Sequence, residues 1–246
     1  MAPYGPQLAQ FYDRHWSLYA QNAAPLLREF FQTRSITRHN PSVLDLGCGT
    51  GHLALHFLST GCPVTGLDLS EEMLYWARLH CRRFILSHQA SFSRKDIRRF
   101  DTPLPFGLVL STYNTLNHLS FDGLKACFQS SFDALVIGGW ALFDLNTAFG
   151  FSEWQDEERM AHSSGTLQVI RSFDASASTG RLFIEGTDGN SGFSECIENF
   201  AHPIQSCIDL LTGSGFSKIY AARVDDLETP LAHPEAEKRV FLVASK

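Results

Sequence analysis

The sequence predicts an α/β fold of the Rossmann-like type, in which a mainly parallel sheet carries helices on both faces. Three observations lead to this prediction. A buried strand runs into a glycine-rich turn and then a helix within residues 43–59. Further strand and helix patterns alternate to about residue 147. Residues 149–201 then change to period-two strands with hairpin turns, which predicts an antiparallel β insertion before the last helix.

The first strand and its turn, Val43–Gly51, follow the breaker pair Asn40-Pro41. Three glycines lack β-carbons, so the backbone can turn sharply and approach a ligand. The helix that begins near His52 points its N-terminal N–H groups at whatever lies on the turn. We therefore expect ligand contacts at Gly47, Cys48, Gly49 and Gly51.

Two acids indicate which ligand the turn binds. The glycine spacing is G-x-G-x-G rather than the dinucleotide pattern G-x-G-x-x-G, and Asp45 stands two residues before the first glycine. A pyrophosphate disfavours a nearby carboxylate, whereas an ammonium and a sulfonium are compatible with one. Asp68 ends the next strand, where an acid can accept both ribose hydroxyls. These features favour S-adenosylmethionine (SAM) over NAD.

Two motifs resemble those of the class I SAM-dependent methyltransferases: Val43–Gly51 resembles motif I, and Gly66–Ser70 resembles motif II. The resemblance implies a seven-stranded methyltransferase sheet with SAM as the cofactor. It also implies that Asp96 binds the adenine amino group and that the backbone N–H of Ile97 meets a ring nitrogen. Leu69, directly after the ribose acid, is expected against the adenine face.

The other core elements follow from hydrophobic periodicity and breakers. Ser70 is expected to cap a helix, and Gly138-Gly139 to separate a helix from the fifth strand. The expected helices cover about 25–32, 71–79, 121–135 and 203–212, and the expected strands 64–68, 91–95, 106–111, 140–144, 216–224 and 238–244. Within the insertion, strands are expected at 168–171, 181–185 and 193–198.

The N-terminal segment is rich in aromatic residues at helical spacing, which suits either an ordinary helix core or a lid over the ligand. In class I methyltransferases, segments before the first strand often close the pocket. Phe11–Arg14 resembles the start of many small-molecule members, and Tyr12 is the best candidate for a cofactor contact.

The fourth strand, Phe106–Ser111, ends at the ligand-binding edge of the sheet, so Ser111 is expected near the cofactor. Six of the eight side chains of Thr112–Leu119 are polar and need partners or a substrate. Gly107 stands where many relatives of class I have an acid. The run lacks the Asn/Asp-Pro-Pro-Tyr pattern, which argues against nucleic-acid bases or protein glutamine as acceptors.

Methyl transfer needs alignment, and an amine or hydroxyl acceptor also benefits from a base. Among ten histidines His118 is the best placed, although it can instead simply satisfy a loop carbonyl. Asn117–Leu119 resembles the Gly-His-Leu segment of the nucleotide-linked amino-sugar N-methyltransferases, in which the histidine is a proposed base. Phe193–Glu195 resembles the Phe-Ser-Asp strand of the same family.

Glu195 and Glu198 are three residues apart on one expected strand, so at most one of them faces the pocket. We favour Glu198, together with Asn199, over Glu195 as a possible substrate contact, although a surface position is the simpler expectation for both acids.

The preferred function is transfer of a SAM methyl group to a nitrogen or oxygen of a small molecule. An alternative is a SAM-consuming enzyme that cyclises or eliminates the aminobutyrate chain, with Tyr113 or Asn114 as catalytic groups that stabilise the sulfonium. A SAM-binding protein without turnover is a less favoured third hypothesis.

Charge, hydropathy and cysteine content limit the binding partners and the cellular compartment that we expect. Residues 151–246 carry 8 Lys and Arg against 15 Asp and Glu, which disfavours nucleic acid. The start of the chain does not resemble a secretory signal, and the longest apolar stretch is about half a membrane span. We expect a cytoplasmic monomer or homodimer without a membrane partner. Six cysteines without a C-x-x-C pair predict buried thiols and no metal site.

The expected organisation is one SAM-dependent methyltransferase domain over residues 1–246. It consists of an N-terminal helical lid (1–39), a SAM-binding core (40–148), a β insertion that caps the substrate (149–201) and the C-terminal part of the core sheet (202–246).

Overall fold

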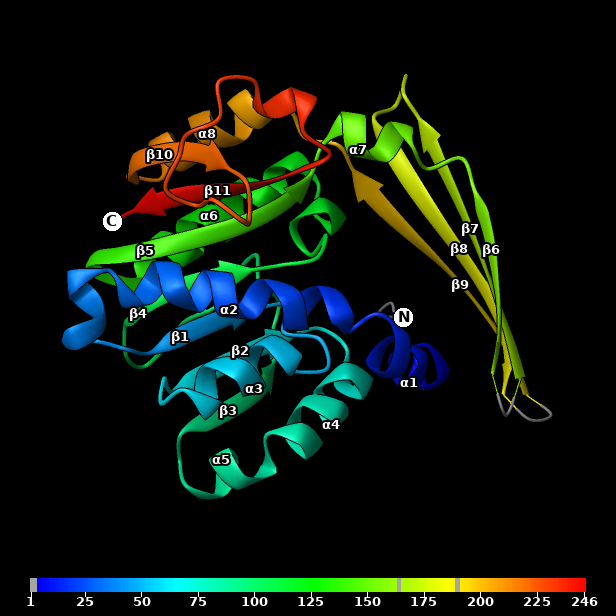
Figure 1. The fold of residues 1–246 in the computed structure, drawn as a ribbon, viewed down its shortest axis with the longest axis horizontal. Helices are drawn as coiled ribbons and strands as arrows, with labels where there is room; N and C mark the ends of the chain where they lie inside the picture. Colours follow the sequence, from blue (N-terminus) through cyan, green and yellow to red (C-terminus); the bar gives the residue numbers. More distant parts are fainter. Residues whose placement is uncertain (1–3, 163–164, 189–190) are drawn as a thin grey trace.

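The computed structural model describes residues 4–162, 165–188 and 191–246. A seven-stranded sheet with helices on both faces forms the core, and a four-stranded antiparallel sheet extends from one side of it (Figure 1). None of the helices in this described part combines the length and the apolar composition that are needed to cross a lipid bilayer.

The core sheet has the strand order β10-β11-β5-β4-β1-β2-β3. The first five strands of the chain pair in parallel, and β11 runs antiparallel to both β5 and β10. The bounds are β1 Val43–Leu46, β2 Val64–Asp68, β3 Ala90–Arg94, β4 Phe106–Ser111, β5 Leu135–Asn146, β10 Ser217–Ala222 and β11 Arg239–Ser245. The predicted seven-stranded sheet is confirmed.

Two hydrophobic clusters lie on opposite faces of the sheet. Along β1, Val43 joins the cluster under α2, α3 and α4, whereas Leu44 and Leu46 join the cluster under α6 and α8. The helices are α1 Pro6–His15, α2 Leu18–Gln32, α3 His52–Ser59, α4 Glu71–His80, α5 Arg82–Leu86, α6 Phe121–Ala134, α7 Ala148–Ser152 and α8 Ile204–Gly213, with short 3₁₀ turns η1 Ser35–Arg38, η2 Leu116–His118 and η3 Pro234–Ala236.

The insertion forms a four-stranded sheet, in the order β6-β7-β8-β9, that lies beside α1 (Figure 1). Leu8 and Phe11 of α1 share a small core with four apolar residues of the sheet: Leu167, Val169, Ile184 and Ile197. The strands are β6 Glu157–His162, β7 Gly165–Asp174, β8 Thr179–Asp188 and β9 Ser191–Phe200. The N-terminal helix therefore lies between the core and the insertion.

Three boundaries differ from the sequence prediction. Helix α2 begins at Leu18 and contains Pro25, because burial of Ala24 and Leu27 against the core holds the helix together across the missing N–H. Strand β5 runs through Gly138-Gly139, where backbone bonds to Lys246 continue the pairing. Strand β6 was not expected, and residues 189–190, between the expected strands 181–185 and 193–198, lie outside the described residues.

Candidate functional site

The glycine turn after β1 has the backbone that its sequence predicts. Gly47 has φ +68°, and a β-carbon there would lie 2.3 Å from Thr115 Cγ2. Gly51 has φ +80°, and its β-carbon would lie 2.9 Å from Ala77 of α4. The first glycine lets the loop after β4 approach the turn, and the last lets α3 pack closely against α4.

A cavity lies over this turn, at the carboxyl ends of the parallel strands. It brings together nine residues that the sequence analysis singled out: Tyr12, Gly47, Gly49, Asp68, Leu69, Asp96, Ile97, Tyr113 and His118. Tyr4, Ser70, Met73, Thr115 and Leu119 complete its wall. We refer to it as the cofactor cavity.

Different groups orient the carboxylates of Asp68 and Asp96: backbone N–H groups bond Asp68, and an arginine side chain bonds Asp96. Asp68 Oδ2 accepts the Gly49 N–H and Oδ1 accepts the Ser70 N–H, each at 2.9 Å, and burial raises the pKa of this carboxyl. Asp96 is more exposed, and Arg98 donates to both of its oxygens. These hydrogen bonds lower the pKa of Asp96 and fix its orientation.

Asp45 lies beneath the turn rather than in the cavity wall. It is 2% exposed, and its Oδ2 has no hydrogen-bond partner among the described residues. Burial, with a smaller effect of the nearby Asp68, raises the pKa of Asp45 to about 8. A buried acid without a partner favours a positively charged neighbour, which suits a ligand with a sulfonium and an ammonium.

Three further predicted cofactor residues lie behind the cavity wall. Ser111 donates to the Leu46 carbonyl at 2.9 Å and so joins β4 to β1. Cys48 is buried against Gly66, and burial raises the pKa of its thiol well above the ordinary value. Gly51 packs against α4. These residues shape the turn from behind.

His118 lies in η2 with its ring between the core and the insertion. Its Nδ1 is 3.2 Å from the Glu198 carbonyl oxygen, and a carbonyl only accepts, so Nδ1 carries the proton. The other nitrogen, Nε2, is then an acceptor, and it accepts the Tyr4 O–H at 3.4 Å. Burial lowers the pKa of His118 below its ordinary value of 6.5. The carbonyl contact thus orients a neutral imidazole whose Nε2 meets the Tyr4 hydroxyl, and both residues line the cavity.

The loop after β4 is held by a buried ion pair that the sequence analysis missed. Arg239 Nη1 lies 2.9 and 2.8 Å from the two oxygens of Asp144, and its second amino group donates to Asn114 Oδ1. Asp144 also accepts the Tyr113 N–H at 2.6 Å. Tyr113 and Asn114 have φ +58° and +66°, a costly backbone that these bonds stabilise.

Asn117, a further polar residue of this loop, is used internally. Asn117 is fully buried, donates to the carbonyls of Asn146 and Phe200, and accepts the Asn146 N–H. Asn117 therefore ties η2 to the ends of β5 and β9.

Gly107 of β4 stands where many relatives have an acid. It has no room for a side chain, because a β-carbon there would lie 2.0 Å from the Asn40 carbonyl oxygen.

A second cavity adjoins the first on the side of the insertion, and we call it the acceptor-side cavity. It shares Tyr4, Tyr12, Tyr113 and His118 with the cofactor cavity and adds Trp16, Asn114, Trp154, Arg171, Leu182 and Asn199. Asn199 is 1% exposed, and its Oδ1 has no partner among the described residues. The wall is thus mainly aromatic, with amides and one guanidinium.

The preference for Glu198 over Glu195 as the inward-facing acid is wrong. Glu198 pairs with Arg181 at 3.2 Å on the exposed face of β9. Glu195 faces α1, where its carboxylate accepts the N–H groups of Tyr4 at 2.6 Å and Gly5 at 2.7 Å. Period-two alternation places Glu195 and Asn199 on the same face, so Asn199 does line the acceptor-side cavity.

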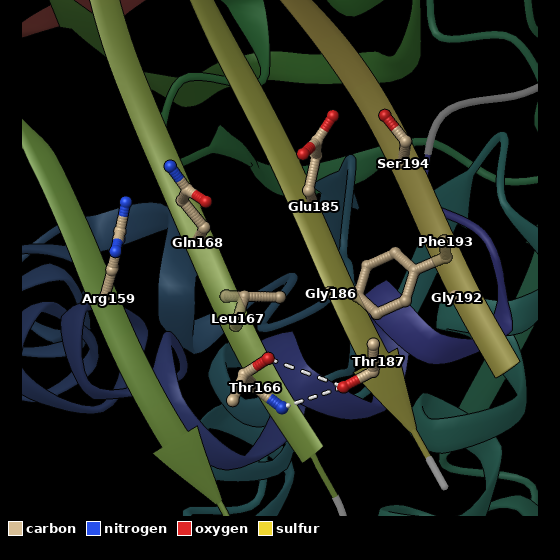
Figure 2. Close-up of a pocket in the computed structure, with 10 residues that line it drawn as sticks. All are labelled: Arg159, Thr166, Leu167, Gln168, Glu185, Gly186, Thr187, Gly192, Phe193 and Ser194. Carbon is tan, nitrogen blue, oxygen red and sulfur yellow. Dashed lines mark hydrogen bonds between the residues drawn. The ribbon is translucent and has the colours of Figure 1, made fainter. Parts of the chain in front are cut away.

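A wider hollow lies near the hairpin end of the insertion (Figure 2). Among the residues that line it, only Arg159 and Glu185 carry a charge, and Figure 2 shows them on different strands. The interactions drawn there join only Thr166 to Thr187. This hollow offers no convergent reactive groups comparable to those around His118.

Comparison with known proteins agrees with this geometry. Residues 43–139 match the family described as "Methyltransferase domain". The putative methyltransferase YqeM of Bacillus subtilis (strain 168) is 28% identical over 215 residues, which cover 83% of each chain.

Two relatives have more specific names. A dTDP-3-amino-3,4,6-trideoxy-alpha-D-glucopyranose N,N-dimethyltransferase of Streptomyces venezuelae is 33% identical over 107 residues, 43% of each chain. A malonyl-[acyl-carrier protein] O-methyltransferase of Enterobacter lignolyticus (strain SCF1) is 39% identical over 163 residues, 65% of this chain and 60% of that protein.

The fold is shared with a solved S-adenosylmethionine-dependent methyltransferase from Clostridium acetobutylicum ATCC 824. The two structures match with a TM-score of 0.76 over 97% of each chain, at 19% identity. The matched domain, the strand order of the core sheet, and Asp68 and Asp96 in the cofactor cavity all fit a SAM-dependent methyltransferase. Residues 43–139 therefore form a methyltransferase domain, and the described chain has the fold of a solved SAM-dependent methyltransferase.

Proposed function

We propose that this methyltransferase acts on a nitrogen or oxygen of a small-molecule acceptor that binds between the core and the insertion. The observation that carries the proposal is the pair of adjoining cavities, which share four residues including His118. One cavity reaches the glycine turn and Asp68, and the other reaches the insertion. Ligands in the two cavities would meet at the His118 ring.

In this proposal the cofactor cavity holds SAM. Asp68 binds the ribose hydroxyls with the acceptor capacity that remains after its bonds to Gly49 and Ser70. Leu69 and Ile97 lie against the adenine, and Asp96, oriented by Arg98, accepts its amino group. The unpartnered Asp45 beneath the turn stabilises the positive charge of the methionine portion.

Bound SAM supplies an electrophilic methyl group on a positively charged sulfur. The chain aligns the acceptor with that methyl and removes a proton, which His118 Nε2 takes as the acceptor reacts. Burial lowers the pKa of His118, so the ring is neutral and ready to accept a proton near pH 7. The Nδ1–H bond to the Glu198 carbonyl keeps the ring in this tautomer.

The acceptor-side cavity favours a small acceptor because residues of α1 and of the insertion line it from two sides. Its amides, Asn114 and Asn199, suit hydroxyl and amine groups, and the named relatives include one N- and one O-methyltransferase. We accordingly assign residues 1–39 as the lid and 149–201 as the substrate cap of one domain. The acidic C-terminal part disfavours nucleic-acid partners, and we further propose a cytoplasmic enzyme without a membrane partner.

Mass spectrometry of the products tests this proposal. The protein is incubated with SAM and a panel of small amines and hydroxyl compounds, alongside SAM alone. We expect S-adenosylhomocysteine and a methylated acceptor in equal amounts, and little turnover without acceptor. Methylthioadenosine from SAM alone would instead support chemistry on the aminobutyrate chain and contradict the proposal.

A further inference from the structure

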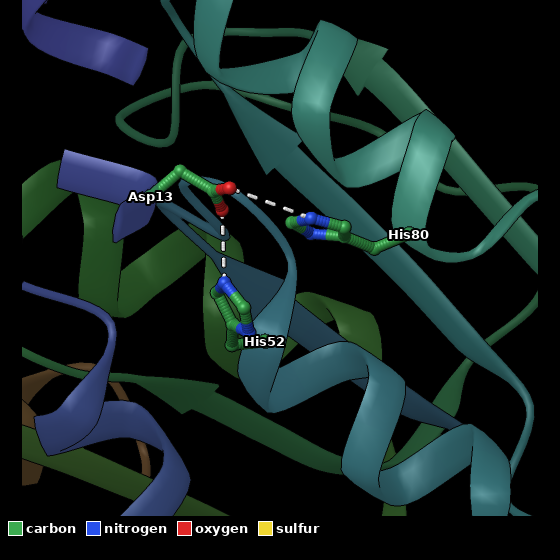
Figure 3. A group of neighbouring side chains, drawn as sticks. All are labelled: Asp13, His52 and His80. Atoms are coloured by element: carbon green, nitrogen blue, oxygen red, sulfur yellow. Dashed lines mark hydrogen bonds and ion pairs between the residues drawn. The ribbon is translucent and has the colours of Figure 1, made fainter. Parts of the chain in front are cut away.

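Three potential metal ligands converge beside the glycine turn, outside both cavities (Figure 3). Asp13 comes from α1, His52 is the first residue of α3, and His80 is the last residue of α4. Their side chains are 12%, 19% and 22% exposed, so an ion can enter while most of the site is shielded from water. Their ligand atoms lie within 4.8 Å of one another.

The hydrogen bonds of His80 and Asp13 show that a proton or a metal ion is needed between these two side chains. His80 Nδ1 lies 2.9 Å from the Thr50 carbonyl oxygen, so Nδ1 carries the proton. In the neutral ring Nε2 then has a lone pair, and it faces Asp13 Oδ2 at 3.5 Å. Two acceptors that face each other repel unless a proton or a metal ion lies between them. On the other side of the same carboxylate, His52 Nε2 lies 2.9 Å from Oδ1.

We propose that Asp13, His52 and His80 bind a divalent transition-metal ion of the zinc type. Two imidazole nitrogens and one carboxylate, with a position left for water, form a ligand set that Zn²⁺ uses, whereas Mg²⁺ and Ca²⁺ prefer oxygen ligands. Tetrahedral bonds of about 2.0–2.1 Å place neighbouring ligand atoms roughly 3.3 Å apart. The observed separations, 2.9 Å from His52 Nε2 to Asp13 Oδ1 and 3.5 Å from His80 Nε2 to Asp13 Oδ2, lie on either side of that value.

The surroundings of His80 also match those of a metal ligand. Histidines that bind metals commonly donate their second N–H to a carbonyl or carboxylate, which fixes the tautomer and the ring orientation. The Thr50 carbonyl does this for His80. Because Thr50 belongs to the glycine turn, the site is linked directly to the backbone beneath the cofactor cavity.

A bound ion would cross-link three elements. Asp13 is the neighbour of Tyr12, which lines both cavities, and His52 follows Gly51 of the turn. The ion would therefore hold α1 over the cofactor cavity and slow the exchange of whatever lies there. This consequence rests on the proposed function, whereas the metal site itself does not.

Isothermal titration calorimetry with ZnCl₂ on the chelator-treated protein of residues 1–246 tests the site. We expect one equivalent of Zn²⁺ to bind to the wild-type protein and to His39→Ala, a matched control at an exposed histidine. His52→Ala and His80→Ala should bind at least about 100-fold more weakly, beyond the 10–100-fold typical of second-shell changes.

Thermal melts keep the test independent of folding defects. In the presence of EDTA each variant should melt cooperatively, and Zn²⁺ should raise the melting temperature of the wild type and of His39→Ala only. Zn²⁺ binding that is unchanged in His52→Ala and His80→Ala, or absent from the wild type, would overturn the proposal. In the second case a proton on His80 Nε2 accounts for the contact with Asp13. Neither readout uses SAM, so failure here is distinct from failure of the proposed function.

Discussion

Burial acts on His118 and Asp45 in opposite senses, because it disfavours whichever form of a group is charged. The pKa of the imidazole falls and the pKa of the carboxyl rises to about 8. His118 is therefore neutral, as a base must be, and Asp45 holds a proton until a cation or a higher pH removes it. Variants of His118 and of Asp45 can therefore test whether the charge state of each residue matters or only its packing.

Replacement of His118 tests its role as the base. His118→Asn keeps a donor toward the Glu198 carbonyl but has no basic nitrogen, so kcat should fall about 10²–10⁴-fold while the Kd for SAM changes little. In the wild type, the acidic fall in kcat/KM should lie below pH 6.5, because burial lowers the pKa of His118 from that value. Unimpaired turnover in His118→Asn would limit His118 to a structural role.

Asp45 should make the stability of the ligand-free protein depend on pH. Its folded pKa of about 8 exceeds its ordinary value of 3.8, so the folded state binds more protons than the unfolded state across this window. Stability therefore falls as pH rises through the window. Between pH 6 and 8 the free energy of unfolding of the wild type should drop by roughly 2 kcal/mol relative to Asp45→Asn.

Denaturant titrations of both proteins at several pH values measure that difference. The other titratable groups are shared, so they cancel in the comparison. Curves for the wild type and Asp45→Asn that run parallel across the window would show that Asp45 is ionised in the folded protein.

The loops and helices that bound the site depend on contacts between elements far apart in the sequence. Arg239 of β11 pairs with Asp144 of β5 and so holds the loop after β4. Glu195 of β9 accepts two N–H groups at the start of α1. The Arg239–Asp144 ion pair thus fixes the position of the loop after β4, and the Glu195 carboxylate fixes the start of α1.

Loss of Arg239 should be costly because it leaves the charge of Asp144, which is fully buried, without its ion-pair partner. Arg239→Met should lower the free energy of unfolding by about 3–5 kcal/mol. The double variant Arg239→Met/Asp144→Asn should recover part of that loss, since no charge remains buried. Denaturant titrations give both values, and a single variant as stable as the wild type would contradict this account.

Glu195 and Glu198 form a matched pair on one strand. Glu195→Ala removes two charge-assisted bonds to the start of α1, so amide hydrogen exchange over residues 6–15 should speed up by roughly 10-fold or more. Glu198→Ala removes only an exposed pair with Arg181, which contributes little. Equal exchange rates in the two variants would show that α1 is held in another way.

The sequence predicted best what local pattern controls. The strand, turn and helix of residues 43–59 follow from nearby apolar residues and glycines, and Asp68 follows from a strand end, whereas Asp96 was singled out by the family resemblance. Contacts across the fold left no such signal: Asp144 and Arg239 are 95 positions apart. Asp13, His52 and His80 meet only because α1, α3 and α4 pack together.

Where local pattern misled, tertiary packing was the reason. Pro25 and Gly138 are breakers by propensity, yet burial of α2 and pairing of β5 with the C-terminus override them. The alternation along β9 allows either Glu195 or Glu198, but not both, to face the core. Only the packing of β9 against α1 decides which of the two does so.

At the scale of the whole molecule, the site is a space closed by three parts. The core supplies the glycine turn and the strand ends, α1 lies above them, and the antiparallel sheet covers α1 from outside (Figure 1). The cofactor cavity measures about 120 Å³, below the roughly 300–1,000 Å³ of small-molecule sites. In the proposed function this cavity has to widen when SAM enters, and the lid, residues 1–39, is the part proposed to move.

Calorimetric titration of SAM into the wild type and Asp68→Ala tests the central claim, that the glycine turn and Asp68 form the SAM site. Two bonds from ribose hydroxyls to a carboxylate contribute about 1.5–3 kcal/mol each, so Asp68→Ala should bind SAM at least about 100-fold more weakly. The exposed Asp101→Ala is the control and should bind as the wild type does. Undiminished SAM affinity in Asp68→Ala, or tighter binding of NADH than of SAM by the wild type, would contradict the account.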